Sequence, residues 1–265
     1  MNLADLNYYL DGTEFLYYGK YYGVIHYICD ERKVGFYSVY VHGSSKPYNI
    51  TKTYMKKFYL DRLKRLRMSI LKNRNITRLV HFTPADNLES ILENGVLSRL
   101  YMDENGFDYW YTDENRLDGK LNYISNSITF PNYKMFWSKR NEDKDTDWIV
   151  LSIDSDILVD KFDTEFYRKN AAANDPLKYK YEPTSNDALE FMFMDYENRD
   201  PYIPENYTTD PQAEVLVKDI IHPSYIKCID TNGFNDAAHS LARNSKVDYN
   251  PCSRLFTYRM DYRRW

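Results

Sequence analysis

Cysteine, membrane-length apolar runs and paired histidines are scarce or missing in this sequence. The three cysteines, Cys29, Cys228 and Cys252, lie far apart and are odd in number, which excludes a disulfide framework and a cysteine-based zinc site. The five histidines form no HxxxH or HxH pair, so we expect no metal. No run reaches the roughly 18 apolar residues that a membrane span needs, and no basic-then-apolar leader opens the sequence. The sequence therefore predicts a cytoplasmic protein without membrane contact.

Acidic residues are almost absent from one stretch, residues 52–78. It holds ten lysines and arginines against one aspartate, Asp61, which gives a local charge of +9 in a chain whose net charge is −4. Such asymmetry indicates a polyanionic partner, and the alternative is an ordinary solvated helix face. The residues that we expect to contact a phosphate backbone are Lys56, Lys57, Lys64, Arg65 and Arg67.

Alternation of apolar and polar residues predicts β-structure near the N-terminus. Residues 22–29 and 34–41 alternate with period two on either side of a polar turn, which is typical of a hairpin. Residues 52–72 repeat apolar side chains at helical spacing. We expect residues 1–75 to form a β-hairpin plus a basic helix, an appendage suited to nucleic acid, and residues 76–265 to form the main domain.

The stretch that organises the main domain is residues 79–97. A short strand is followed by Thr83 as a helix N-cap, Pro84 at the first helical position, an apolar stripe, and Gly95 as the stop. His81 would project from the end of the strand beside the start of the helix, where a phosphate-bearing ligand can be held. The alternative is a purely structural histidine.

The remaining pattern predicts alternating strands and helices separated by irregular segments. Residues 197–211 contain three prolines and form a long loop that leads into a strand opening with Glu214. The other expected elements are strands at 124–130, 148–153, 212–217 and 225–229, a loop with an aromatic cluster at 131–136, and helices near 161–169, at 187–196 and at 236–243.

Three residues from separate segments are candidates for one site: His81, the turn residue Arg116, and Glu214. No spacing among them is a specific motif, and each has an ordinary structural explanation as a core histidine, a surface turn or a solvated strand end.

Three blocks in the correct order resemble the DarT family of bacterial DNA ADP-ribosyltransferase toxins. Residues 81–97 (HFTPADNLESILENGVL) look like its opening motif, residues 115–119 (NRLDG) with 124–136 like its next block, and residues 212–217 (QAEVLV) with 223–226 (PSYI) like its closing block. The resemblance covers about residues 77–230. It implies an α+β fold: an ADP-ribosyltransferase-like split antiparallel β-sheet core with flanking helices, preceded here by the hairpin and helix.

The resemblance also implies roles for individual residues. His81 and Thr83 would contact the nicotinamide ribose and amide of NAD, the co-substrate, and Asn87 would help to hold it. Glu214 would bond the 2′-hydroxyl of that ribose, and Arg116 matches the catalytic arginine. In the loop before Glu214, whose place in the family is substrate recognition, the candidates to stack a base are Tyr202 and Tyr207, and Gln212 occupies a position that faces the substrate in relatives with protein targets.

The function implied is transfer of ADP-ribose from NAD to a base of single-stranded DNA, with release of nicotinamide. Guanine and thymine are both open, and residues 124–136 favour guanine slightly. Such an enzyme would act as a toxin or phage-defence effector restrained by an antitoxin of the ADP-ribosylglycohydrolase type. The alternatives are an ADP-ribosyltransferase acting on RNA or protein, and a catalytically silent nucleic-acid-binding protein that relies on the basic helix.

Overall fold

The computed structural model describes residues 14–17, 20–29, 35–40, 48–50, 52–107, 119–194 and 199–264. The chain divides into two compact units, Met1–Leu66 and Arg67–Trp265, which we describe separately. The two units meet within a helix, whereas the sequence-based boundary at residue 75 falls after it.

The first unit contains a four-stranded antiparallel sheet in the order β1-β2-β3-β4, and helix α2 begins there. The predicted hairpin is confirmed as β2 and β3, which pair from Val24↔Tyr40 to Cys29↔Gly35. The predicted basic helix is confirmed as α2. The bounds are β1 (Glu14–Tyr17), β2 (Lys20–Cys29), β3 (Gly35–Tyr40), β4 (Tyr48–Ile50) and α2 (Lys52–Asn73).

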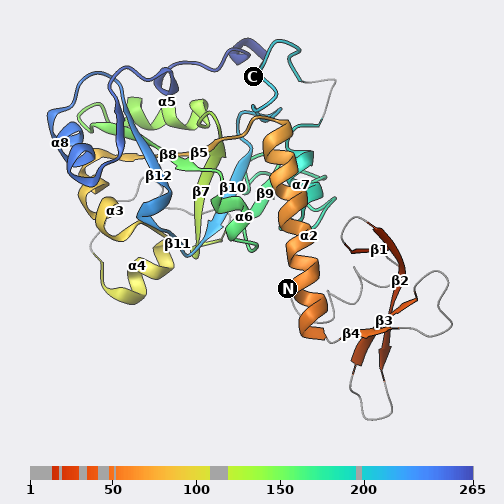
Figure 1. The fold of residues 1–265 in the computed structure, drawn as a ribbon. Helices are drawn as coiled ribbons and strands as arrows, with labels where there is room; N and C mark the ends of the chain where they lie inside the picture. The colour runs from red at the N-terminus through yellow and green to blue at the C-terminus, as the bar shows by residue number, and fades with distance from the viewer. Residues whose placement is uncertain are drawn as a thin grey trace. The chain divides into compact units, whose positions relative to one another are not determined.

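The second unit is built on a seven-stranded sheet in the order β13-β12-β8-β5-β7-β10-β9 (Figure 1). The bounds are β5 (Arg78–Pro84), β7 (Tyr123–Ile128), β8 (Trp148–Asp154), β9 (Glu165–Tyr167), β10 (Glu214–Lys218), β12 (Ile226–Thr231) and β13 (Asp248–Asn250), and a small separate sheet joins β6 (Val96–Leu97) to β11 (Ile220–Ile221). The expected antiparallel sheet is in fact mixed. Strands β12 and β13 run parallel, because helix α8 lies between them and supplies the crossover that parallel strands need.

The sheet opens between two of its central strands. Strand β5 pairs with β8 along its whole length, from Arg78↔Asp154 to Pro84↔Trp148. It pairs with β7 only at Leu79 and Val80. Beyond Val80 the edges of β5 and β7 therefore separate, and side chains rather than the backbone ladder connect them.

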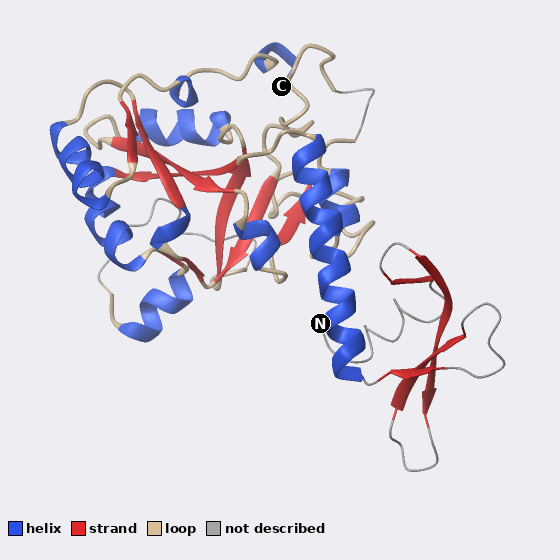
Figure 2. Cartoon of the chain, viewed as in Figure 1, coloured by secondary structure: helices blue, strands red, loops and turns tan. Residues whose placement is uncertain are grey.

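Helices lie on both faces of the sheet (Figure 2), and apolar side chains pack between the helices and the strands. Helices α3 and α8 pack into the larger core, with Leu79, Ile128 and Val215 from the strands. Helix α5 packs on the other face with Val80 and an aromatic group that includes Phe256. The helix bounds are α3 (Leu88–Asn94), α4 (Arg99–Asn105), α5 (Tyr133–Glu142), α6 (Ile157–Asp160), α7 (Asn186–Phe191) and α8 (Asp236–Ser245). Within the described residues, none of the helices combines the length and apolar character that membrane crossing requires.

The predicted cap of the organising stretch is wrong. Thr83 and Pro84 belong to strand β5, a 3-10 turn follows, and the N-cap of α3 is Asn87. Pairing with Ile149 and Trp148 on β8 extends the strand past the proline, since a proline needs no ladder donor at a strand end. The predicted stop is confirmed: Gly95 ends α3 with a φ of 90°, and a Cβ there would lie 2.3 Å from the carbonyl oxygen of Ile221.

Two further local predictions are wrong for identifiable reasons. The expected loop at 131–136 begins α5, because the Asn132 side chain accepts a hydrogen bond from the Met135 amide and caps a helix. The expected helix near 161–169 contains strand β9 instead. Pairing with β10 buries Phe166, so tertiary contacts override the local preference.

Candidate active site

Glu214 is a buried carboxylate with three hydrogen-bond donors. It opens β10, whose next three residues are fully buried, so the ladder with β7 and β9 fixes its backbone. Its Oε1 accepts from Ser125 Oγ at 3.1 Å and from Asn170 Nδ2 at 3.2 Å, and its Oε2 accepts from the Ala171 amide at 2.7 Å. These bonds offset the cost of removing a charge from water and fix the carboxylate orientation.

His81 lies at the point where the sheet opens, directly after the last residue that β5 pairs with β7. Its Nδ1 is 2.8 Å from the carbonyl oxygen of Ser125. A carbonyl only accepts, so Nδ1 carries the proton in this bond. The structure thus brings His81 and Glu214 to one residue: Ser125 accepts from the histidine through its backbone and donates to the carboxylate through its hydroxyl.

Thr83 and Asn87 lie next along the chain and contact each other. The Asn87 amide donates to Thr83 Oγ1 at 2.9 Å, and Thr83 is buried. This bond occupies the Asn87 side chain, which makes no capping bond to α3. Arg116 falls outside the described residues, so its predicted role stays a prediction.

Sequence reasoning missed Ser125, Asn170 and Ala171. A polar residue within the strand pattern of 124–130 was a weak signal for Ser125, and nothing local marks the other two. Asn170 and Ala171 belong to an irregular segment held by an ion pair between Arg168 Nε and Asp175 Oδ2 at 2.9 Å. The Arg168 guanidinium also lies over the ring of Phe191 on α7. The segment that contacts Glu214 is therefore fixed rather than loose.

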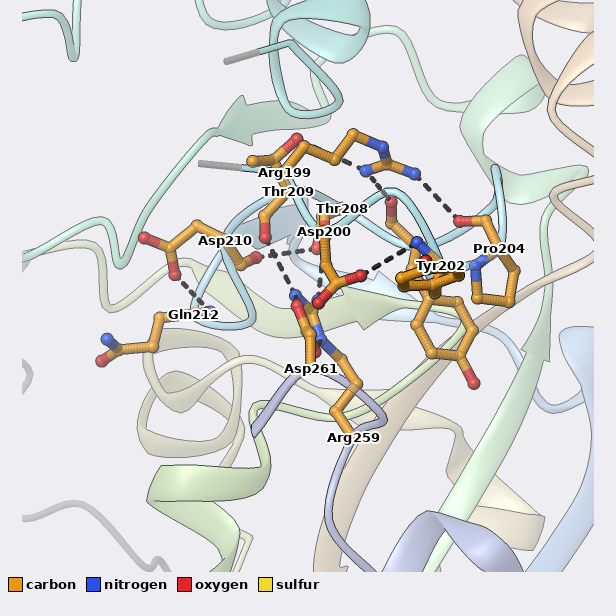
Figure 3. Close-up of polar contacts among 11 residues, drawn as sticks. Arg199, Asp200, Tyr202, Pro204, Thr208, Thr209, Asp210, Gln212, Arg259 and Asp261 are labelled. Carbon is orange, nitrogen blue, oxygen red and sulfur yellow. Dashed lines mark hydrogen bonds and ion pairs between the residues drawn. The ribbon is translucent and has the colours of Figure 1, made fainter. Parts of the chain in front are cut away.

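The loop that precedes β10, residues 199–213, is held by two arginines (Figure 3). Arg199 donates to the carbonyl oxygens of Tyr207 at 2.7 Å and Pro204 at 2.9 Å. Arg259, from the C-terminal segment, donates to those of Thr208 and Thr209, each at 2.9 Å. We call residues 199–213 the recognition loop, after the role that the family resemblance predicts for it.

Arg259 is itself buried and charge-compensated. It is 2% exposed, and its Nε donates to Asp261 Oδ1 at 2.6 Å while its Nη2 pairs with Asp261 Oδ2 at 2.5 Å. Bidentate pairing of this kind adds geometric precision as well as energy. Two backbone carbonyls of the recognition loop are therefore fixed by residues about 50 positions further along the chain.

The two loop tyrosines differ in exposure. Tyr202 is 85% exposed, as a residue available to a ligand would be. Tyr207 is half-buried, its ring lies 5.6 Å from that of Phe130, and burial raises the pKa of its hydroxyl. The Tyr207 ring is therefore used in packing the loop. Of the two tyrosines, Tyr202 is the more accessible to a ligand.

Asp210 and Gln212 form the last turn of the loop before Glu214. The Gln212 amide donates to Asp210 Oδ1 at 2.8 Å. Burial raises the pKa of the Asp210 carboxyl, against the opposing effect of this bond and of nearby lysine and arginine charges. A second buried carboxyl thus lies four residues before Glu214.

The basic stretch includes one residue that cannot bind DNA as predicted. Arg67 is 1% exposed, and its guanidinium donates to Asn186 Oδ1 and to the carbonyl oxygens of Leu158 and Thr184, each at 2.8 Å. Burial lowers its pKa to about 10. Arg67 is therefore a structural residue, and its assignment to the DNA contact is corrected.

The other residues of the predicted DNA contact differ in their exposure to solvent. Lys57 and Arg65 are exposed and Lys64 is half-buried, whereas the side chain of Lys56 lies outside the description. Exposed positive charges on one helix remain compatible with a phosphate backbone. Among the described residues, no group of three histidine, cysteine or acidic side chains is placed to hold a metal ion.

The family described as "ssDNA thymidine ADP-ribosyltransferase, DarT" matches residues 80–245. No curated protein matches the chain.

Two solved proteins are weakly similar to this chain. Thermosipho africanus DarTG in complex with ADP-ribose is 17% identical with a TM-score of 0.45, and the match covers 68% of this chain and 51% of that one. Thermus sp. 2.9 DarT is 12% identical with a TM-score of 0.41 in its complexes with NAD+ and with ADP-ribosylated ssDNA. Those matches cover 69% of this chain and 98% and 97% of the Thermus chains. The chain spans about half the length of the Thermosipho protein.

Proposed function

Because the chain belongs to the DarT family of ssDNA thymidine ADP-ribosyltransferases, we propose that Glu214 is the carboxylate that carries transfer of ADP-ribose from NAD to a thymine of single-stranded DNA. In this reaction the bond between nicotinamide and ribose breaks, and nicotinamide leaves with the electron pair. A nitrogen of the base forms the new bond to the ribose and loses its proton to a basic group of the enzyme.

The observation that carries the proposal is the fixed, buried carboxylate of Glu214. Departure of nicotinamide leaves positive charge on the ribose, and a preorganised negative group beside it lowers the barrier, typically by about 3–4 kcal/mol. Three hydrogen bonds hold this carboxylate in place before the reaction begins. No reorganisation is then needed when charge develops.

The residues along the opening of the sheet fit NAD as the co-substrate. His81, Thr83 and Asn87 are proposed to offer a ring nitrogen, a hydroxyl and an amide to the nicotinamide ribose and amide group. Arg116 is proposed as the catalytic arginine that assists proton removal with Glu214. The Thermus relative was solved with NAD+, which is consistent with this choice.

The acceptor follows from the family and from the chemistry of DNA. The family description names thymidine, so thymine replaces the slight preference for guanine from sequence. A base inside a duplex cannot reach a closed site, so single-stranded DNA or an extruded base is the substrate. Tyr202 is proposed to stack that base, and the exposed cations of α2 to contact the backbone.

The cellular role proposed is that of a cytoplasmic toxin controlled by an antitoxin. The Thermosipho relative is named DarTG, which fits a toxin paired with a partner, and we propose an ADP-ribosylglycohydrolase-type antitoxin for this chain. RNA or protein as acceptor is the alternative, for which Gln212 is the residue to examine.

Incubation with labelled NAD and a panel of acceptors tests the substrate. Label retained on a thymidine-containing single strand, and absent from a strand without thymidine, is the expected result. Label found only on RNA or only on protein would show that this molecule, and not DNA, is the acceptor. Absence of label from every acceptor would contradict an NAD-dependent transferase.

Glu214→Gln tests the catalytic carboxylate. The amide has nearly the same shape but no charge, so we expect transfer to fall at least about a hundredfold, as for loss of a strong electrostatic contact. The measurement is the initial rate of label transfer, with circular dichroism to show an intact fold. Glu142→Gln, at an exposed glutamate on α5, is the matched control. Unchanged transfer by Glu214→Gln would remove Glu214 from the mechanism.

A further inference from the structure

The C-terminal segment, residues 253–264, has two faces of opposite character. Arg259 and Asp261 are 2% and 3% exposed, whereas Tyr258, Met260 and Tyr262 between and around them are 57%, 69% and 41% exposed. Large apolar side chains gathered at one exposed place indicate a binding surface more often than isolated ones do. The segment lies beyond the family match, which ends at residue 245.

The buried face fixes the segment against the recognition loop. Arg259 donates to the carbonyl oxygens of Thr208 and Thr209 and pairs with Asp261, as Figure 3 shows. Leu255 and Phe256 pack into the same aromatic core as α5. The exposed side chains are therefore held on a rigid support beside the loop that leads to Glu214.

The exposed face combines flat rings with positive charge. The rings of Tyr258 and Tyr262 stack with centroids 5.1 Å apart and planes 25° apart. The Arg263 guanidinium lies over the Tyr262 ring at 5.7 Å, and Arg254 is exposed on the same segment. The one acidic residue of the segment, Asp261, is buried in its pair with Arg259, so it does not reduce the positive charge presented to solvent.

We propose that residues 253–264 form a second binding surface for single-stranded DNA, on which bases flanking the modified thymidine stack on Tyr258 and Tyr262 while Arg254 and Arg263 meet phosphates. The inference rests on the proposed function, because it assigns part of the same substrate. Aromatic rings next to cations are how proteins hold single strands without reading their sequence. A DNA strand bound to this segment would lie next to the recognition loop, because Arg259 connects the segment to that loop.

Paired substitutions test the stacking surface. Tyr258→Ala with Tyr262→Ala should raise the Kd for a thymidine-containing oligonucleotide by about tenfold or more, because stacking on both rings is lost. Tyr258→Phe with Tyr262→Phe keeps both rings and, apart from the hydroxyl that accepts from Arg263 Nε at 3.2 Å, the same surface, so it should bind close to the wild type. Phe234→Ala removes a 63% exposed ring that does not belong to residues 253–264 and is the matched control. Fluorescence anisotropy of the labelled oligonucleotide measures each Kd.

Steady-state kinetics separates a DNA contact from a general structural role. The alanine pair should raise KM for DNA by a similar factor and leave KM for NAD and the melting temperature unchanged. An unchanged Kd for DNA would overturn the proposal. A rise in KM for NAD as large as the rise in KM for DNA, together with a lower melting temperature, would also overturn it. Transfer by the wild type is the reference: if the wild type does not label DNA, the proposed function fails, whereas wild-type labelling with unaffected variants rejects only this surface.

Discussion

Arg65 and Arg67 lie two positions apart on α2 but differ in their exposure to solvent. Arg65 is exposed, and Arg67 is enclosed by Phe162, Phe166 and three oxygen acceptors. The helix turns by about 100° per residue, so neighbouring members of a basic run point in different directions. Counting charges along the sequence overestimates how many of them face a ligand.

Arg67→Met should destabilise the second unit without changing its affinity for DNA. The substitution leaves the side-chain oxygen of Asn186 and two carbonyl oxygens without their donor, which we expect to cost about 2–4 kcal/mol. Urea unfolding measures the change in the free energy of unfolding. Arg65→Met is the control and should stay within about 0.5 kcal/mol. A loss of DNA affinity in Arg67→Met at wild-type stability would restore Arg67 to the DNA contact.

The sequence indicates the chemically distinctive residues of the site but not those that hold them. His81 and Glu214 were both predicted at strand ends, where a pattern of apolar residues makes a polar one conspicuous. Glu214 does open β10, but the predicted position of His81 is wrong, because pairing with β8 continues β5 from His81 to Pro84. Ser125 and Asn170 reach Glu214 from 89 and 44 residues away, and their own surroundings are ordinary. Contacts of that kind depend on strand order, which periodicity does not specify.

At the scale of elements, segments with a residue pattern of their own were predictable, and segments that depend on a single contact were not. Helix α2 and the hairpin β2–β3 follow from periodicity over many residues, and strand β8 follows from a short apolar run. Helix α5 depends on one capping residue, Asn132, after a proline, and β9 on pairing with β10. A three-residue strand has too little pattern of its own to compete with a helical alternative.

The exposed cations of α2 should contribute to DNA binding through charge alone. Replacing Lys57 and Arg65 by Glu should weaken binding to single-stranded DNA of any sequence, and should reduce the slope of log Kd against log salt by about one for each lost phosphate contact. Titrations at several salt concentrations give that slope. Arg243→Glu, at an exposed arginine near the end of α8, is the control. If the slope of log Kd against log salt is unchanged in the α2 variant, the helix does not contact DNA and its charges only face solvent.

At the scale of the whole molecule, the second unit has its own core and contains His81, Glu214 and the residues that hydrogen-bond to them. Its core draws on Ile70 and Leu71 at the end of α2, on the central strands, and on α3 and α8. The last turns of α2 therefore belong to this unit, and a boundary placed after residue 75 would remove part of its support.

A chain that begins at Lys52 should fold and retain transfer to DNA. It loses the four-stranded sheet of the first unit but keeps all of α2 and the complete core of the second unit. We expect the melting transition of the second unit to be preserved, as measured by calorimetry, and labelled NAD to give product. A chain that begins at Ile76 is the comparison and should be less stable because it lacks Arg67, Ile70 and Leu71. An unfolded or inactive Lys52 chain would show that the first unit is needed for the site.

The bond from Arg259 to the recognition loop also has a consequence for the timing of synthesis. Translation releases the loop and Glu214 before residues 259–261, so a nascent chain presents the carboxylate while the carbonyl oxygens of Thr208 and Thr209 still lack their donor. Domains generally complete folding only when their last contacting residues have emerged from the ribosome. The ability to modify DNA would then arise only after residues 259–261 have been synthesised and can bind the loop.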